Sequence, residues 1–270
     1  RNSIKIKKSY SENSSDILKS NLKSNDVVNS LDINGCSEIF SLKEEIVQKI
    51  QSEVLNNLND AYAFSPQGKY RSLSDKNFLN YDEIKDFLQK EEMYIVRNDL
   101  NFKNSPHIKK TFTSPFFMEI AHSYLNTKKI TFSGTFVATN LINKHLSSEN
   151  ENEIKNKSAQ LYHRDVNYKK FFKIGIYLTN VESERDGAHV FIPGSHSKCL
   201  KRHIVTDRYD SKDIEANYKK KIYTGNAGSL FFVDTFGIHK GSTAIDNFRK
   251  VIFLEYGKGH VELSKNAIFL

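Results

Sequence analysis

The sequence has few of the residues that mark secreted, disulfide-stabilised or membrane-spanning proteins. It contains two cysteines, four prolines, two methionines and no tryptophan among 270 residues. Two cysteines cannot build a disulfide framework, so we expect a reducing, cytoplasmic location. No run approaches the roughly 20 apolar residues that a membrane-spanning helix needs. The chain begins at Arg1 rather than Met, which leaves open whether an upstream segment was removed.

Aromatic residues are abundant, with 19 Phe and 13 Tyr, although the mean hydropathy is only −0.55. Disordered chains are poor in aromatic residues, so we expect a packed core of single-domain size. The formal charge is +8, which suits anionic partners. The lysines are scattered, however, and only residues 169–173 and 218–221 combine basic and aromatic side chains. The charge therefore favours a solvated surface, and we expect no nucleic-acid partner.

The first part of the chain is predicted to be an arm followed by helices. Residues 1–40 are rich in Ser, Asn and Lys, which is typical of a mobile or peripheral N-terminal arm. A capping-box pattern starts at Ser41, and apolar residues then recur at helical spacing to about Ala63. Further helices are predicted over residues 81–90 and from Pro115. We therefore expect a helical cover over about 41–126 within a single domain of residues 41–270.

The second part of the chain is predicted to be mainly β. Apolar, β-branched and aromatic runs occur at residues 130–142, 160–165, 171–181, 188–192, 229–239 and 249–256. Glycine-containing turn signals separate several of these runs, and a polar loop is expected at 144–158. Helices followed by many strands indicate an α+β fold, mainly β, with an antiparallel sandwich or barrel over about 129–257.

Three residues stand in a pattern that suits a metal. His163 and Asp165 lie two apart in a predicted strand, so both side chains project from one face. A second imidazole from elsewhere would complete a two-His-one-carboxylate triad, which suits Fe(II) because it leaves coordination positions open. His239 is the candidate, at the end of an apolar strand. Arg249 begins another apolar strand, where its guanidinium needs an anion or solvent, and a cosubstrate carboxylate suits its two-pronged geometry.

These features together resemble the phytanoyl-CoA dioxygenase family of Fe(II)/2-oxoglutarate oxygenases. The resemblance rests on residues 160–165, 173–181, 186–196, 228–230, 239–242 and 249, which follow the family order. It implies a double-stranded β-helix (jelly roll, cupin-like) with flanking N-terminal helices. It also implies that His163, Asp165 and His239 hold Fe(II), that Arg249 binds 2-oxoglutarate, and that Ser242 hydrogen-bonds nearby.

The activity implied by the resemblance is hydroxylation of a C–H bond of a small molecule, with O₂ consumed and succinate and CO₂ released. Asp165 disfavours halogenation, because related halogenases carry a small residue at that position. The basic residues of segment 198–208 suggest an anionic or carboxylated substrate. Desaturation, cyclisation and the oligomeric state stay open.

Alternation along residues 171–181 adds two candidates. Lys173 and Tyr177 share the more polar face of this strand and are expected to look into the cosubstrate or substrate pocket, although Lys173 reaching solvent at the barrel mouth is an equal alternative. His189 and His196 are interpreted as structural.

Three other functions suit parts of this sequence. A catalytically silent binding protein of the same fold is the main alternative, and a nucleic-acid-directed oxygenase ranks lower. Residues 162–165 also resemble a protein-kinase catalytic loop, but Lys170 stands where that motif needs Asn and no glycine-rich loop is present.

Overall fold

The computed structural model describes residues 14–65, 70–141, 155, 159–166, 169–197, 208–258 and 266–270. Its helices are η1 (Ser14–Asp16), α1 (Ser24–Asn34), α2 (Glu44–Leu55), η2 (Leu58–Asp60), α3 (Tyr81–Lys90), α4 (Pro106–Phe112), α5 (Pro115–Leu125) and α7 (Ser211–Asn217). Its strands are β1 (Cys36–Ser41), β2 (Tyr62–Phe64), β3 (Tyr70–Ser72), β4 (Ile95–Asp99), β5 (Ile130–Thr139), β6 (Phe171–Tyr177), β7 (His189–Phe191), β8 (Lys221–Tyr223), β9 (Ser229–Val233), β10 (His239–Gly241), β11 (Arg249–Lys258) and β12 (Ile268–Phe269).

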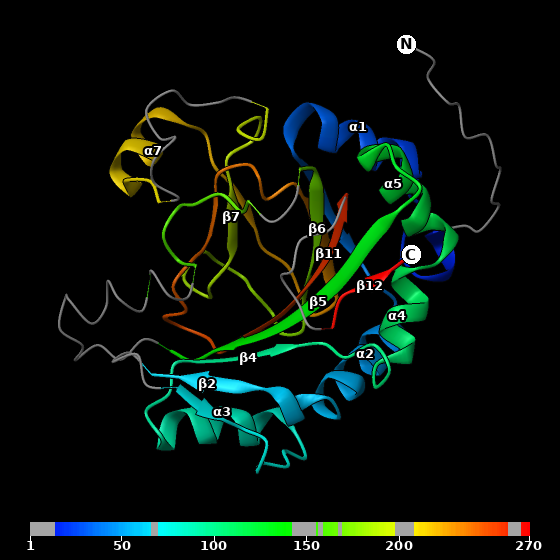
Figure 1. Ribbon diagram of the computed structural model, residues 1–270. Helices are drawn as coiled ribbons and strands as arrows, with labels where there is room; N and C mark the ends of the chain where they lie inside the picture. The colour runs from blue at the N-terminus through cyan, green and yellow to red at the C-terminus, as the bar shows by residue number, and fades with distance from the viewer. Residues whose placement is uncertain are drawn as a thin grey trace.

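The strands form two antiparallel sheets that face each other. The larger sheet has the order β1-β9-β6-β11-β5-β4-β2-β3, with β12 added to β5, and the smaller has the order β10-β7-β8. Helices α1, α2, α4 and α5 lie along one side of the larger sheet, and β7 of the smaller sheet lies on its other side (Figure 1). This arrangement is the predicted double-stranded β-helix.

Strand β11 is the central element that carries charged residues into the space between the sheets. All ten of its residues pair with β5, and seven pair with β6. Because alternate side chains of a strand share one face, Arg249, Phe253 and Glu255 line the same cavity. The tight register on both sides fixes where these side chains lie.

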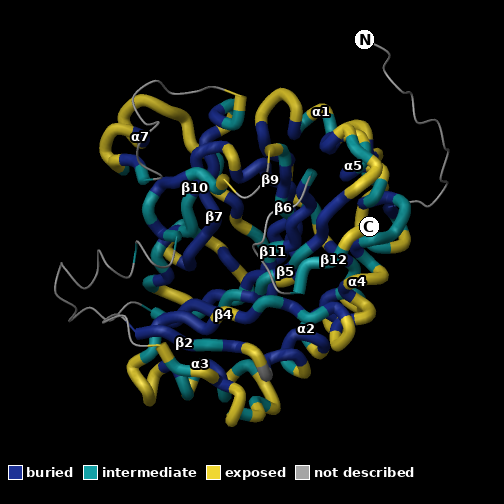
Figure 2. Tube along the Cα trace, in the orientation of Figure 1, coloured by how far each residue is buried: buried dark blue, intermediate teal, exposed yellow. Residues whose placement is uncertain are grey.

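The two faces of β6 enter different cores, as alternation predicts. Phe172, Ile174 and Ile176 pack with the helices in the largest hydrophobic cluster. Tyr177 belongs to a smaller cluster between the two sheets. Gly175 makes room for this second cluster, because a Cβ atom there would lie 2.3 Å from the Phe231 ring. Buried positions accordingly concentrate in the strands and exposed ones on the outer helices (Figure 2).

The start of the domain differs from the prediction of a peripheral arm over residues 1–40. Strand β1 pairs with β9, and Leu18, Val27 and Leu31 are buried in the main core. Two apolar residues four positions apart in α1 are enough to bury one face of this helix in the core, while its polar residues cover the exposed face. Residues 14–40 are therefore part of the fold, and residues 1–13 lie outside the described residues.

Three local expectations also need correction. Ser41 ends a strand, and α2 begins at Glu44 with Lys43 as a cap that makes no side-chain hydrogen bond. The predicted helical cover contains β2, β3 and β4, which extend the larger sheet. The predicted strand at residues 229–239 divides into β9 and β10, which join different sheets. No helix within the described part of the chain is both long and apolar enough to cross a membrane.

Candidate active site

Two imidazoles are brought close together by backbone pairing. The amide of His163 donates to the carbonyl of His239 at 2.9 Å, and the amide of His239 donates back at 2.9 Å. The ring centroids lie 4.2 Å apart. The predicted strand over residues 160–165 is reduced to isolated bridges at His163, but this pairing keeps the extended geometry that aims both rings to one side.

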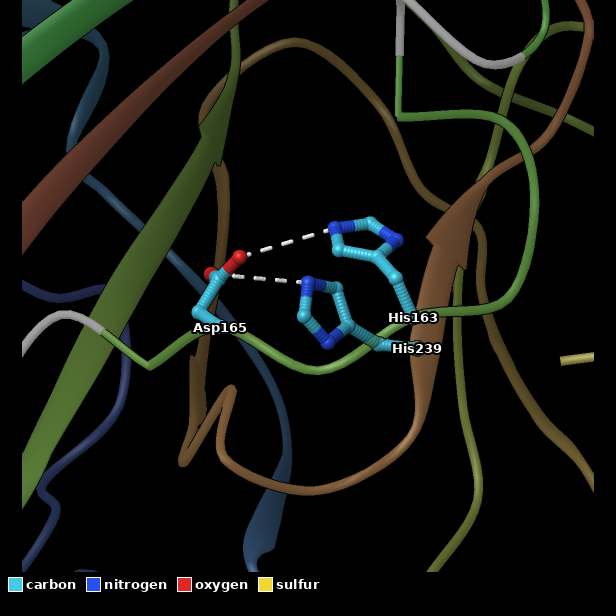
Figure 3. Close-up of side chains that lie close together, drawn as sticks. All are labelled: His163, Asp165 and His239. Carbon is cyan, nitrogen blue, oxygen red and sulfur yellow. Dashed lines mark ion pairs between the residues drawn. The ribbon is translucent and has the colours of Figure 1, made fainter. Parts of the chain in front are cut away.

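Asp165 completes the cluster. Its amide donates to the carbonyl of Thr235 at 2.8 Å, which fixes the backbone two residues after His163. Its carboxylate oxygens lie 3.5 Å from Nε2 of His163 and 3.6 Å from Nε2 of His239. Figure 3 shows the three side chains converging on one point. One ligand atom from each of them lies within 4.8 Å of the others.

The outer nitrogens of both rings are fixed by the backbone. Nδ1 of His163 lies 2.8 Å from the carbonyl of Leu161, and Nδ1 of His239 lies 3.0 Å from the carbonyl of Gly237. A carbonyl only accepts, so each Nδ1 carries a proton, and each Nε2, which faces Asp165, is the nitrogen that a metal would use. Metal-binding histidines are held in this way, and the donor set therefore fits a divalent cation.

The charge states of the cluster also suit a cation. Burial lowers the pKa of His239 to about 3, so its imidazole is neutral at pH 7. Burial alone raises the pKa of Asp165, but the Lys173 ammonium, with the imidazoles, holds it well below its usual range. Imidazole nitrogens and a carboxylate are the ligands that a divalent transition metal takes.

The segment at residues 192–196 supports the loop that precedes His239. The hydroxyl of Ser195 accepts from the amide of Ile238 at 2.7 Å and donates to the carbonyl of Ile192 at 2.6 Å. The guanidinium of Arg164 donates to the carbonyl of Ser195 at 2.8 Å. This turn thereby ties the His163 segment to the His239 segment. His196 does not line the cavity, in agreement with its interpretation as structural.

The cluster opens into a cavity of about 450 Å³. The cavity lies between the sheets and is lined by Tyr62, Phe64, Tyr70, Ile95, Arg97, Asp99, Ser133, Thr135, Val137, Ala159, His163, Asp165, Lys173, His189, Thr235, His239, Gly241, Arg249, Phe253 and Glu255. It therefore contains the three candidate ligands, Arg249 and Lys173, but not Ser242 or Tyr177.

Arg249 is a buried cation with no carboxylate beside it among the described residues. Its Nη1 donates to the carbonyl of Gly187 and its Nη2 donates to Oγ1 of Thr139 at 3.3 Å, while Nε has no partner. A Cβ atom at Gly241 would lie 3.2 Å from Nη1, so glycine there leaves room for the guanidinium. Burial lowers the pKa of Arg249 from its usual value. An anion in the cavity would satisfy this group.

Lys173 is held by two carboxylates rather than directed to solvent. Its Nζ lies 2.7 Å from Asp165 and 3.1 Å from Glu255. Burial lowers the pKa of Lys173, but these two carboxylates outweigh burial and raise it. The expectation that Lys173 faces the pocket agrees with the cavity lining, and its ammonium is already paired there.

The two remaining predicted residues lie outside the cavity. The Tyr177 hydroxyl donates to the carbonyl of Tyr223 at 2.9 Å and accepts from the amide of His189 at 2.8 Å. Both of its hydrogen bonds are therefore used between the sheets. The Ser242 hydroxyl donates to Glu184 at 3.2 Å. Neither side chain is placed where it would meet a molecule in the cavity.

Some cavity residues were missed by sequence reasoning. Glu255 interrupts the apolar run of β11 on the same face as Arg249, and this interruption was a usable signal. The residues that β2, β3 and β4 contribute to the cavity had no comparable signal in the sequence, because their position depends on how these strands pair.

His189, which also lines the cavity, stacks on Phe231 with ring centroids 5.3 Å apart. Its Nε2 is buried without a partner among the described residues.

Comparison with known proteins identifies the relatives of this chain. The model of the family described as Phytanoyl-CoA dioxygenase (PhyH) matches residues 39–248. No curated protein matches the sequence.

Several solved structures share the fold. The carbocyclase SnoK from nogalamycin biosynthesis is 13% identical with a TM-score of 0.54, over 87% of this chain and 86% of that chain. HygX from Streptomyces hygroscopicus, with nickel and 2-oxoglutarate bound, is 12% identical with a TM-score of 0.54, over 86% and 85%. EctD from S. alaskensis, with bound Fe, is 14% identical with a TM-score of 0.53, over 85% and 75%.

Proposed function

The chain belongs to the phytanoyl-CoA dioxygenase family, and on that premise we propose that it is an Fe(II)- and 2-oxoglutarate-dependent dioxygenase. Its reaction is the hydroxylation of a C–H bond of a small molecule, with 2-oxoglutarate and O₂ consumed and succinate and CO₂ released. Two similar structures carry 2-oxoglutarate with nickel, or iron, which supports the same cofactors here.

One observation carries the proposal: a cluster of three candidate ligands and a buried arginine, with no carboxylate beside it among the described residues, line the same cavity. His163, Asp165 and His239 would hold the metal through two Nε2 atoms and one carboxylate. Arg249 binds the distal carboxylate of 2-oxoglutarate, which supplies the acceptor that its guanidinium lacks. The bound iron and 2-oxoglutarate supply the oxidising equivalent when O₂ reacts.

The protein's own residues orient these groups. The carbonyls of Leu161 and Gly237 keep both imidazoles in the tautomer that presents Nε2. Lys173 donates to Oδ2 of Asp165 at 2.7 Å, which orients this carboxylate, and Oδ1 would be the oxygen free to bind the metal. A single carboxylate oxygen leaves coordination positions open for a bidentate cosubstrate and O₂.

The test is succinate formation from 2-oxoglutarate in air with added Fe(II). We expect succinate from the native protein and a loss of at least about 100-fold in Asp165→Ala, since one metal ligand is gone. Asp75→Ala, a change at an exposed aspartate outside the cavity, is the matched control and keeps full turnover. Native protein that shows no metal-to-ligand charge-transfer band when 2-oxoglutarate is added to the anaerobic Fe(II)-treated sample would instead favour the silent binding protein.

A further inference from the structure

His189 is a buried cavity residue that the proposed function does not use. It is the first residue of β7, it lines the same cavity as the three candidate metal ligands and Arg249, and it is 3% exposed. Its Nε2 is buried and has no hydrogen-bond partner within the described ranges. Burying a polar atom without a partner costs free energy, so such an atom beside a binding cavity indicates a ligand that pairs with it.

Packing alone does not account for a histidine at this position. The imidazole stacks on Phe231 with ring centroids 5.3 Å apart, and its centroid lies 5.8 Å from that of Phe253 and 6.0 Å from that of Tyr223. A phenylalanine could fill this aromatic setting without burying an unpaired nitrogen. The structural role expected from the sequence therefore explains the stacking of His189 but not its nitrogens.

Strand pairing places His189 near the guanidinium of Arg249. His189 stands opposite Gly241 in the β7–β10 pair, and residues opposite each other on antiparallel strands project from the same face, with Cβ atoms about 5 Å apart. A Cβ atom at Gly241 would lie 3.2 Å from Nη1 of Arg249. Gly241 has no side chain to fill the space between His189 and Arg249, and all three residues line the cavity.

The contacts on either side place His189 between Arg249 and the metal cluster. The carbonyl of Gly187, two residues before His189, accepts a hydrogen bond from Nη1 of Arg249. On the other side, the His189 ring centroid lies 5.5 Å from that of His239. A cosubstrate that reaches from the metal ligands to Arg249 therefore passes beside the His189 imidazole.

We propose that His189 is a second binding residue for 2-oxoglutarate, and that its imidazole donates a hydrogen bond to the distal carboxylate that Arg249 binds. A neutral imidazole has one N–H to donate, and a carboxylate has enough acceptor sites for both a guanidinium and an imidazole. This role rests on the proposed function, since it adds a residue to the cosubstrate site of that reaction.

The anionic or carboxylated substrate expected from the sequence stays a prediction. Most of the basic residues that suggested it fall within residues 198–207, which lie outside the described part of the chain.

The test uses two molecules that differ only at the distal group: 2-oxoglutarate, and 2-oxopentanoate, which has a methyl group in place of the distal carboxylate. Titration of the Zn(II)-loaded full chain measures both dissociation constants, by calorimetry for 2-oxoglutarate and by ligand-observed NMR for 2-oxopentanoate. His189→Phe keeps a ring that can stack on Phe231 and removes both nitrogens. We expect this variant to bind 2-oxoglutarate about tenfold more weakly and 2-oxopentanoate with native affinity.

A merely structural role of His189 would affect both ligands alike. An equal loss for the two ligands in His189→Phe overturns the proposal, and so does native affinity of this variant for 2-oxoglutarate. His189→Gln restores a side-chain N–H and should recover most of the affinity, whereas a loss as large as that of His189→Phe would contradict the hydrogen bond. His107→Phe changes an exposed histidine outside the cavity and, as the control, should bind both ligands like the native protein.

The native titration separates this role from the proposed function. Native protein that binds Zn(II) and 2-oxoglutarate, with an affinity that His189→Phe retains, overturns the role of His189 alone. Native protein that binds Zn(II) but not 2-oxoglutarate contradicts the proposed oxygenase, and the role of His189 fails with it.

Discussion

Strand β11 carries two buried residues of opposite charge, and only one of them is paired with a residue of the other charge. Arg249 and Glu255 are 5% and 7% exposed and line the same cavity. Glu255 lies opposite Lys173 and pairs with it at 3.1 Å. Within the described ranges, Arg249 has only neutral oxygen acceptors, and its Nε has none. Removing one partner of a buried ion pair leaves an uncompensated charge and destabilises the fold, whereas a buried guanidinium without a counter-charge can accept a carboxylate ligand.

The largest effect is expected from removing the Lys173 ammonium from its ion pairs with Asp165 and Glu255. Lys173→Met leaves Asp165 and Glu255 without their shared cation, and we expect the metal-free protein to lose about 3–5 kcal/mol of unfolding free energy. Urea denaturation of the metal-free protein measures this loss. Lys212→Met, a change of an exposed lysine outside the cavity, should leave the unfolding free energy nearly unchanged. A similar stability for Lys173→Met and native protein would mean that the ion pair is not structural.

At Arg249 we expect the reverse: its substitution should weaken ligand binding without a loss of stability. Arg249→Gln should weaken 2-oxoglutarate binding about 100-fold, which corresponds to roughly 3 kcal/mol. Its unfolding free energy should stay the same or rise, because a buried charge without a counter-charge is removed. Calorimetric titration of 2-oxoglutarate into Zn(II)-loaded protein checks the binding. Native affinity in this variant would remove Arg249 from the cosubstrate site.

A smaller effect is expected from pH, through the buried imidazoles. Burial lowers the pKa of His239 to about 3, and it lowers that of His189 well below the usual value. The folded protein then binds fewer protons than the unfolded chain, so the stability is complete above about pH 6.5 and falls below it. Each histidine contributes a slope of about 1.4 kcal/mol per pH unit.

Denaturation of the metal-free protein between pH 7 and pH 5 measures this slope. His189→Gln should reduce the loss by about 2 kcal/mol between pH 6.5 and pH 5, because one of the two imidazoles no longer titrates. His107→Gln replaces an exposed histidine and serves as the control. An unchanged slope in His189→Gln would show that His189 is not held neutral by the fold.

The smallest effect is expected at Tyr177, which lies on the cavity side of β6 but does not reach the cavity. Tyr177→Phe leaves the carbonyl of Tyr223 and the amide of His189 without a partner, at a cost of about 1–2 kcal/mol. The affinity for 2-oxoglutarate should not change. A loss of cosubstrate binding at native stability would restore the role predicted from the sequence.

The three candidate ligands were predictable because each stands in a short local pattern. His163 and Asp165 are two residues apart, and His239 follows an apolar strand. Arg249 followed from its place at the start of another apolar strand. The structure brings all four side chains into one cavity.

The rest of the site depends on pairing between distant strands, which no local pattern reports. Glu255 meets Lys173 only because β11 and β6 pair in one register. The aromatic residues of β2 and β3 enter the cavity only because β2, β3 and β4 extend the larger sheet, where helices alone were expected. In the same way, the polar composition of residues 14–40 concealed a few apolar positions that seat them in the core.

The central claim is that the triad and Arg249 together bind Fe(II) and 2-oxoglutarate. Its most direct test is the visible absorption of the anaerobic protein as 2-oxoglutarate is added after Fe(II). A metal-to-ligand charge-transfer band should appear in the native protein. Asp165→Ala should show no band, and Arg249→Gln should need about 100-fold more 2-oxoglutarate. A native protein that shows no band under these conditions would contradict the account.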